Sequence, residues 1–143
     1  MPLLLEIVTP ERLAYSDTVD AVNLPGIEGE LGVLPHHAPL VSMLGVGELR
    51  IRKGVAEESF AIVGGFLQVR PDKVVVMAET ADMASEIDLE KAHHAKREAE
   101  QALEGGARTD AVDLAAARAA LQHALLRIRV AERRHREGPR HRG

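Results

Sequence analysis

The hydrophobic pattern of this sequence changes near Ser85, and the change divides the chain into two parts of different structural class. Before it, short runs rich in β-branched residues alternate with turn residues, and Leu49–Arg52 repeats with the period of two that is typical of a half-buried strand. After it, Glu90–Leu103 consists mostly of Ala, Glu, Lys and other strong helix formers. The sequence therefore predicts an α+β protein in which a β domain precedes a helical one.

The first part contains several strand candidates at close spacing, each bounded by turn residues. They are residues 19–24, 49–52, 60–63, 66–69 and 74–78. Val74–Ala78 is apolar at every position, so we expect it to be buried on both faces. Many short strands without intervening helices favour an antiparallel β-sandwich, which we assign to residues 1–85.

Two helices are predicted in the second part. The first has Ser85 and Asp88 as alternative N-caps and ends at Gly105-Gly106, because Gly commonly follows the last turn of a helix. The second restarts after Thr109-Asp110 and ends near Glu137-Gly138-Pro139.

A short connection between these helices predicts an antiparallel hairpin over residues 86–137, followed by a disordered basic tail at residues 138–143. Apolar residues of the second helix recur at spacings of three and four, as Leu114, Ala117, Leu121, Ala124, Ile128 and Ala131. Against them the first helix offers Ala92, Ala95, Ala99 and Ala102. Since burial contributes only about 0.8 kcal/mol per CH₂ group, such a seam is expected to be modestly stable.

The charge of the chain is unevenly distributed. Residues 1–86 contain 6 Lys/Arg and 13 Asp/Glu, whereas residues 118–143 contain 8 and 2. An acidic first part and a basic end predict separate surfaces for separate partners. One Tyr, two Phe and no Trp leave few rings on which bases could stack, so no nucleic-acid partner is expected.

Other composition signals restrict the compartment. The absence of cysteine fits a reducing environment. No run approaches the roughly 18 apolar residues of a membrane span, so membrane association is expected only through a partner.

Residues 24–40 contain three Gly and three Pro, which predicts short strands and tight turns that form a contact surface. His36 and His37 are adjacent and lack a third ligand at a suitable spacing, so no metal site is expected. A nucleophile paired with a base is also missing, which argues against an enzyme such as a metal hydrolase.

The run Glu-Gly-Glu-Leu-Gly-Val-Leu-Pro-His-His-Ala-Pro-Leu at residues 28–40 closely resembles the epsilon subunit of bacterial and plastid F-type ATP synthase. Residues 7–12, 64–69 and 78–81 also match, and the resemblance covers about residues 3–135. It implies a non-catalytic rotor subunit of the central stalk that serves ATP synthesis and hydrogen ion transport. It also implies peripheral attachment at the cytoplasmic face of a bacterial cell membrane, with the plastid thylakoid as the alternative.

The resemblance further implies partners and contact residues. The β-sandwich would bind the gamma subunit and the ring of c subunits, through Glu28, Glu30, His37 and Pro39. The hairpin would extend to the alpha and beta catalytic subunits and inhibit ATP hydrolysis, by family analogy through contacts with acidic loops of beta. Our candidates for that contact are Arg118, Arg127, Arg129, Arg133 and Arg134.

A nucleotide-binding role is the alternative function. Ile87, Asp88, Lys91 and Ala92 resemble the motif Ile-Asp-x-x-Arg-Ala of some family members. Lys91 replaces the arginine and loses its bidentate geometry, and Glu98 stands where a further arginine is expected. We prefer the simpler interpretation that Asp88 caps a helix and Lys91 is solvated, and we expect no cofactor, with weak ATP binding as the alternative.

Overall fold

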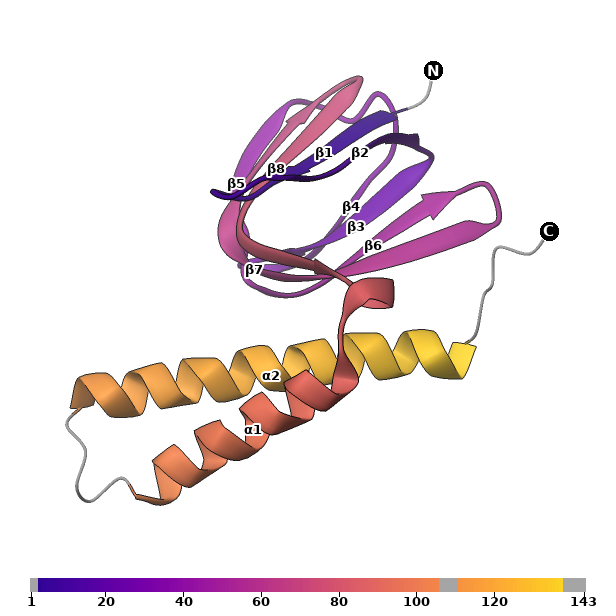
Figure 1. The fold of residues 1–143 in the computed structure, drawn as a ribbon. Coiled ribbons are helices and arrows are strands. Elements are labelled where there is room, and N and C mark those ends of the chain that lie inside the picture. Colours follow the sequence, from indigo (N-terminus) through magenta and orange to yellow (C-terminus); the bar gives the residue numbers. More distant parts are fainter. Residues whose placement is uncertain (1–2, 106–110, 138–143) are drawn as a thin grey trace.

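The computed structural model describes residues 3–105 and 111–137, which fold into a β-sandwich followed by two helices (Figure 1). The strands are β1 (Leu3–Val8), β2 (Leu13–Val19), β3 (Ala21–Gly26), β4 (Gly29–Val33), β5 (Leu40–Met43), β6 (Val46–Lys53), β7 (Ala56–Arg70) and β8 (Lys73–Met83). They are hydrogen-bonded in the order β2-β1-β8-β7-β6-β3-β4, and β5 also pairs with β7. The named pairs are antiparallel except β1 with β8, which is parallel.

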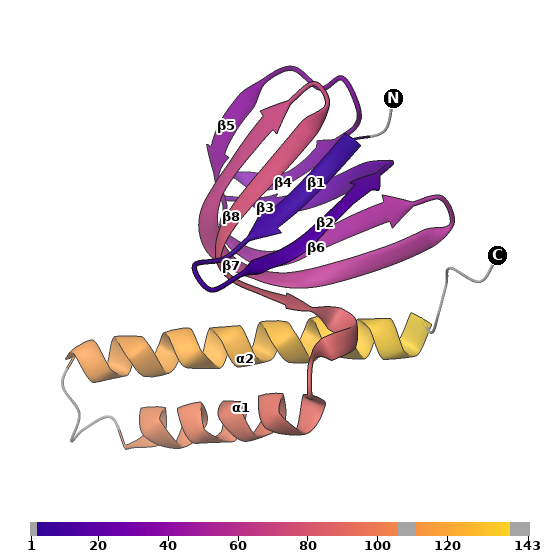
Figure 2. The same cartoon turned by 45° about the horizontal axis from the view of Figure 1, so that its top comes forward.

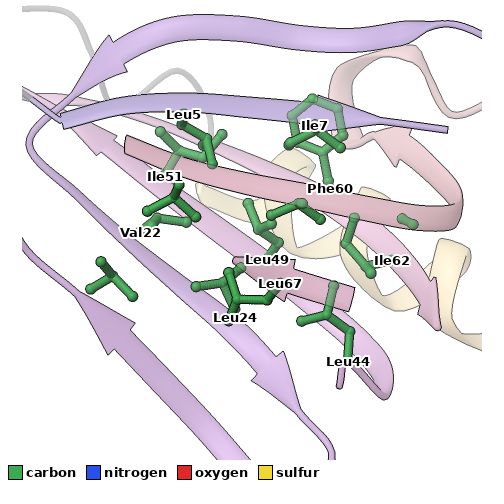
Figure 3. Close-up of a cluster of buried hydrophobic side chains, with 14 of the residues drawn as sticks. Leu5, Ile7, Val22, Leu24, Leu44, Leu49, Ile51, Phe60, Ile62 and Leu67 are labelled. Atoms are coloured by element: carbon green, nitrogen blue, oxygen red, sulfur yellow. The ribbon is translucent and has the colours of Figure 1, made fainter. Parts of the chain in front are cut away.

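The core of the sandwich is aliphatic, and its residues come from alternate positions of the strands. In β1, Leu3, Leu5 and Ile7 are buried, as the period of two requires. Figure 3 shows Leu5 and Ile7 facing side chains from several other strands, among them Phe60. Phe60 also packs edge-on against Tyr15, with ring centroids 5.6 Å apart. Burial of Tyr15, with the nearby charges of Asp17 and Glu58, raises the pKa of its hydroxyl.

β7 is the longest strand, and it changes partner along its length. Its first half pairs with β6, and its second half, from Phe66 to Val69, pairs with β5. Between the halves, Gly64 and Gly65 have φ values of 59° and 113°, and the pair Gly64/Glu79 is missing from the pairing with β8, whose register is the same on both sides. The predicted strands 60–63 and 66–69 are therefore parts of one strand, divided by an irregularity at the two glycines.

The irregular backbone at Gly64 and Gly65 changes which side chains of β7 face the core. Ala61 and Val63 lie on the outer face before it, and Phe66 lies on the outer face after it, because Phe60, Ile62 and Leu67 all point into the core. The outer face of β7 thus has two halves: α2 covers the half with Ala61 and Val63, and the half with Phe66 is exposed.

The expectation for Val74–Ala78 was wrong in part. Val74, Val76 and Ala78 are buried, but Met77 is 46% exposed. The strand is apolar on both faces, yet the structure covers its second face only in part.

The helical part begins with a 3-10 turn η1 (Ala84–Glu86), followed by α1 (Leu89–Glu104) and α2 (Ala111–Glu137). Of the two candidate caps, Asp88 is the N-cap, since its Oδ1 accepts a hydrogen bond from the Lys91 amide at 3.2 Å. Gly105 follows the last residue of α1 as predicted. The predictions for Gly106, for Thr109-Asp110 and for the tail at residues 138–143 lie outside the described residues.

α1 and α2 lie side by side, and α2 lies between α1 and the sandwich in both views (Figures 1 and 2). The predicted stripe of α2 is confirmed: Ala117, Ala124, Ile128 and Ala131 are buried, and Leu114 and Leu121 are half-buried. The predicted packing of four alanines of α1 is confirmed only for Ala92 and Ala99, which are buried. Ala95 and Ala102 are exposed, so the prediction was wrong for them. None of the described helices is long and apolar enough to cross a membrane.

Candidate functional site

The second half of α2 holds the hairpin on the sandwich through an apolar contact. Leu126 and Val130 are buried against Ala61 and Val63 of β7 and Ala84 of η1. These two residues lie on a different side of α2 from the stripe that faces α1. α2 therefore has two apolar sides, one for each neighbour.

Ion pairs surround this contact. Arg127 Nε donates to Asp82 Oδ2 of β8 at 2.9 Å, and Arg134 Nη1 lies 3.5 Å from Glu58 Oε1 of β7. The side chains of these two pairs are between 25% and 38% exposed. The pairs therefore lie at the edge of the contact, where solvent weakens but does not remove their attraction.

The third ion pair is more enclosed. Arg133 Nε donates to Glu48 Oε2 of β6 at 3.1 Å, and its Nη2 contacts the same oxygen and donates to Ser59 Oγ at 3.1 Å. The Glu48 side chain is 17% exposed, and Ser59 is buried. A guanidinium with several directed bonds to one carboxylate and a hydroxyl is a strong and specific contact.

The five arginines predicted to contact another subunit therefore divide into two groups. Arg127, Arg133 and Arg134 bind the sandwich of the same chain, whereas Arg118 and Arg129 are exposed. The side of α2 that bears Arg127, Arg133 and Arg134 therefore faces the β-sandwich of the same chain.

The four residues of the nucleotide-motif resemblance come together in one pocket of about 460 Å³. The pocket lies between the sandwich and the hairpin, and its lining includes Ile87, Asp88, Lys91, Ala92, Arg12, Arg127, Asp82 and Glu86. Three cationic side chains thus face three carboxylates. Because Arg127 is paired with Asp82, and Glu86 and Asp88 balance the two remaining cations, the pocket offers a phosphate no net positive charge.

The four residues predicted to contact the gamma subunit and the c-ring lie at two separate places. Glu28 is in the β3–β4 turn and Glu30 follows in β4, where Glu30 Oε1 lies 3.3 Å from Arg50 Nη2. His37 and Pro39 are in the connection after β4, at the other end of that strand. The backbone amide of His36, at a φ of 68°, ties this connection to the carbonyl of Pro71 at 2.6 Å.

An exposed apolar patch joins these two places, and sequence reasoning missed it. It consists of Val41, Met43, Phe66 and Met77, which are 69%, 50%, 50% and 46% exposed. Met43 pairs with Phe66, and Phe66 pairs with Met77, so the three form a row across β5, β7 and β8 on one face. Val41 lies two residues before Met43 and shares that face.

The patch reaches both groups of predicted residues. β5 starts directly after Pro39, and at its far end the carbonyl of Met43 accepts a hydrogen bond from the Ile27 amide, beside Glu28. Exposed apolar residues in such a row are typical of a protein interface. The sequence feature that could have indicated this patch was the fully apolar run Val74–Ala78. Only one face of this strand packs in the core, so its other apolar face was available for a partner.

The other chemistry-bearing side chains do not converge. Within residues 3–105 and 111–137, no group of three or more His, Asp or Glu side chains is arranged to hold a metal ion. His37 Nδ1 lies 2.7 Å from the carbonyl oxygen of Ala38, its own neighbour.

Two family models match this chain along nearly its whole length. The model of the ATP synthase delta/epsilon chain β-sandwich domain matches residues 2–84, and the model of its long α-helix domain matches residues 85–132.

Individual relatives and structures agree with these matches. The chain is 47% identical over 132 residues to the ATP synthase epsilon chain of Dehalococcoides mccartyi, covering 92% of this chain and 94% of the relative. It is 45% identical over 128 residues to the ATP synthase epsilon chain of Desulforamulus reducens, with coverages of 90% and 96%. A chain in the Euglena gracilis mitochondrial ATP synthase structure (OSCP/F1/c-ring) matches with a TM-score of 0.72 and 27% identity, covering 85% of this chain and 76% of that one.

Proposed function

Because the chain belongs to the ATP synthase delta/epsilon family, we propose that it is a non-catalytic subunit of the central stalk, which links the gamma subunit to the ring of c subunits. Its hairpin inhibits ATP hydrolysis by the alpha and beta subunits. The complex attaches it to the cytoplasmic face of a bacterial membrane, with the thylakoid as the alternative. Proton flow through the ring is then coupled to ATP synthesis through this chain.

The observation that carries the docking part is the outer apolar patch (Val41, Met43, Phe66 and Met77). Val41 and Met43 of this patch lie along β5, which runs from the His37/Pro39 connection to the turn that holds Glu28. The sandwich thus offers an apolar centre for the gamma subunit and acidic side chains at one border for the c-ring. An apolar centre with a polar rim is the usual composition of a stable interface.

Substitution of Phe66 tests this docking surface. We expect Phe66→Glu to weaken binding of the full chain to the isolated gamma subunit at least about tenfold, since a central aromatic residue commonly contributes more than about 1.4 kcal/mol. Val55→Glu is the matched control, because Val55 is also apolar and exposed but lies in the β6–β7 turn. Equal affinities of the two variants, measured by titration calorimetry, would show that the patch is not part of the interface with the gamma subunit.

Nucleotide binding is the second candidate function. The pocket that contains Ile87, Asp88, Lys91 and Ala92 has a volume of about 460 Å³, within the range of small-molecule sites. Its balanced charge favours weak binding at most. In calorimetry with ATP, Lys91→Ala should abolish any heat of binding and Lys96→Ala should not, because Lys96 is absent from the pocket lining. The same heat from both variants would exclude the pocket.

A further inference from the structure

We propose that Met43 and Met77 are sites of reversible oxidation, and that a sulfoxide at either residue prevents the outer apolar patch from binding its partner. The last step rests on the proposed docking of this patch on the gamma subunit. The first step, selective oxidation of the two methionines, concerns this chain alone. The chain contains no cysteine, so methionine supplies its only oxidisable sulfur atoms.

The two methionines flank one aromatic residue on the outer face of the sheet. Met43 of β5 is opposite Phe66 of β7, and Phe66 is opposite Met77 of β8. Side chains opposite each other on one face of a sheet have Cβ atoms about 4.5–5.5 Å apart, which brings a thioether within reach of a neighbouring ring. The three side chains therefore form one apolar unit, with a sulfur atom on each side of the ring.

This unit is part of a longer apolar row that crosses five strands. Met77 is also opposite Val8 of β1, and Val8 is opposite Leu13 of β2. Leu13 is 57% exposed, and Val8 is half-buried. Because residues opposite each other share a face, the apolar surface continues across β1 to the edge strand β2. Met77 is the central member of this row, so a polar group there would divide the apolar surface in two.

Exposure distinguishes these two methionines from Met83, the third methionine among the residues that the structure describes. Met43 is 50% exposed and Met77 is 46% exposed, whereas Met83 is half-buried and packs against the core of the sandwich. An oxidant must reach the sulfur atom, so susceptibility follows exposure. Met43 and Met77 are therefore the oxidation-sensitive positions among these three.

The reaction transfers one oxygen atom from a peroxide to the thioether. The sulfur lone pair attacks one oxygen of hydrogen peroxide, an S–O bond forms, the O–O bond breaks, and the second oxygen leaves as water after a proton transfer. The sulfur loses two electrons and the peroxide gains them, so no other reactant is needed. The product is a polar sulfoxide, which methionine sulfoxide reductases return to the thioether.

Oxidation acts on the chain before it docks, because a partner that covers the row also shields its sulfur atoms. In the docked state a sulfoxide would lie among apolar side chains, and burial of a polar group without a hydrogen-bond donor is unfavourable. Oxidation and docking therefore oppose each other, and an oxidised chain stays out of the complex until it is reduced.

Peptide mass spectrometry of the full chain after treatment with hydrogen peroxide tests the first step. In the folded chain we expect Met43 and Met77 to be oxidised at least about fivefold faster than Met83, and in urea we expect similar rates at all three, because their exposure no longer differs. Equal rates in the folded chain would overturn the proposal. So would the same difference in urea, since exposure would then not be its cause.

Binding to the isolated gamma subunit tests the second step, and each chain is compared with its own untreated sample. Peroxide treatment should weaken binding of the native chain at least about tenfold, and methionine sulfoxide reductases should restore it. The variant Met43→Leu/Met77→Leu replaces both thioethers by apolar groups of similar volume, so peroxide should not change its affinity. Met83→Leu is the matched control and should lose affinity on oxidation as the native chain does.

The outcomes separate the oxidation switch from the docking function. If the untreated chain binds the gamma subunit and the oxidised chain binds equally well, the switch is wrong and the proposed function stands. If peroxide weakens Met43→Leu/Met77→Leu as much as the native chain, these two methionines are not the cause and the proposal is overturned. If the untreated native chain does not bind the gamma subunit, the proposed docking is wrong, and the switch with it.

Discussion

Gly65 is the residue on which the division of the outer face depends. Its φ of 113° lies outside the range that L side chains readily adopt, and an added Cβ would collide with the carbonyl oxygen of Met77 in the paired strand β8. Ala61 and Val63, before the irregularity at Gly64 and Gly65, pack against α2, whereas Phe66, after it, is uncovered on the same strand.

We expect Gly65→Ala to lower the free energy of unfolding by about 2–4 kcal/mol, through the combined cost of backbone strain and steric overlap. Gly54→Ala is the matched control. Gly54 also has a positive φ, of 63°, but an added Cβ there has nothing within 4 Å, so the cost should be about 1–2 kcal/mol. Urea unfolding of the two full-length variants would measure both values, and equal losses would show that the close approach to β8 is unimportant.

This residue also shows a limit of sequence reasoning. Gly64-Gly65 is visible in the sequence, and strands on both sides of it are predictable from their β-branched residues. Whether the two strands are one is decided by partners distant in sequence, since β6 pairs with one half and β5 with the other. The pattern near the glycines contains no information about those partners.

At the scale of elements, α2 is a helix with two buried sides. Its heptad stripe was predictable because apolar residues recur at spacings of three and four. The second buried side was not predictable. Leu126 and Val130 lie among arginines in the sequence, so by sequence alone they belong to a basic, solvated stretch. For the same reason the sequence offered Arg127, Arg133 and Arg134 as contacts to another subunit, while the structure pairs them within the chain.

The adjacent leucines of α2 provide a test of the second side. Leu126 is 2% exposed and Leu125 is 44% exposed. Leu126→Ala should cost the docked hairpin about 2–3 kcal/mol, whereas Leu125→Ala should cost less than about 1 kcal/mol. Hydrogen exchange of the amides of α2 and η1 would show the difference as faster exchange in Leu126→Ala. Similar exchange in both variants would mean that α2 is not held by this apolar contact.

At the scale of the whole molecule, the structure combines a β-sandwich with a hairpin that is attached through one side of α2. The order of domains and their class were predictable, because β and helical periodicities do not overlap in this chain. The parallel pairing of β1 with β8 was not, since it joins the two ends of the sandwich and no local turn specifies it. The outer apolar patch became visible only when the strands were assembled, because its four residues come from three strands.

The outer apolar patch of the sandwich and the basic side of α2 differ in how much of each is already in contact with the rest of the chain. The outer apolar patch is exposed, whereas Arg127, Arg133 and Arg134 of α2 are bound to carboxylates of the sandwich. In the proposed function, the sandwich docks on the gamma subunit and the hairpin acts on the alpha and beta subunits.

The most direct test of that account is ATP hydrolysis by the cognate catalytic complex, measured with the full chain and with a version that ends at Ser85. We predict faster hydrolysis with the shortened chain, while its binding to the gamma subunit is retained because the outer apolar patch is intact. Equal rates with both chains, at equal binding, would contradict the account and leave the sandwich as a docking and coupling part without a brake.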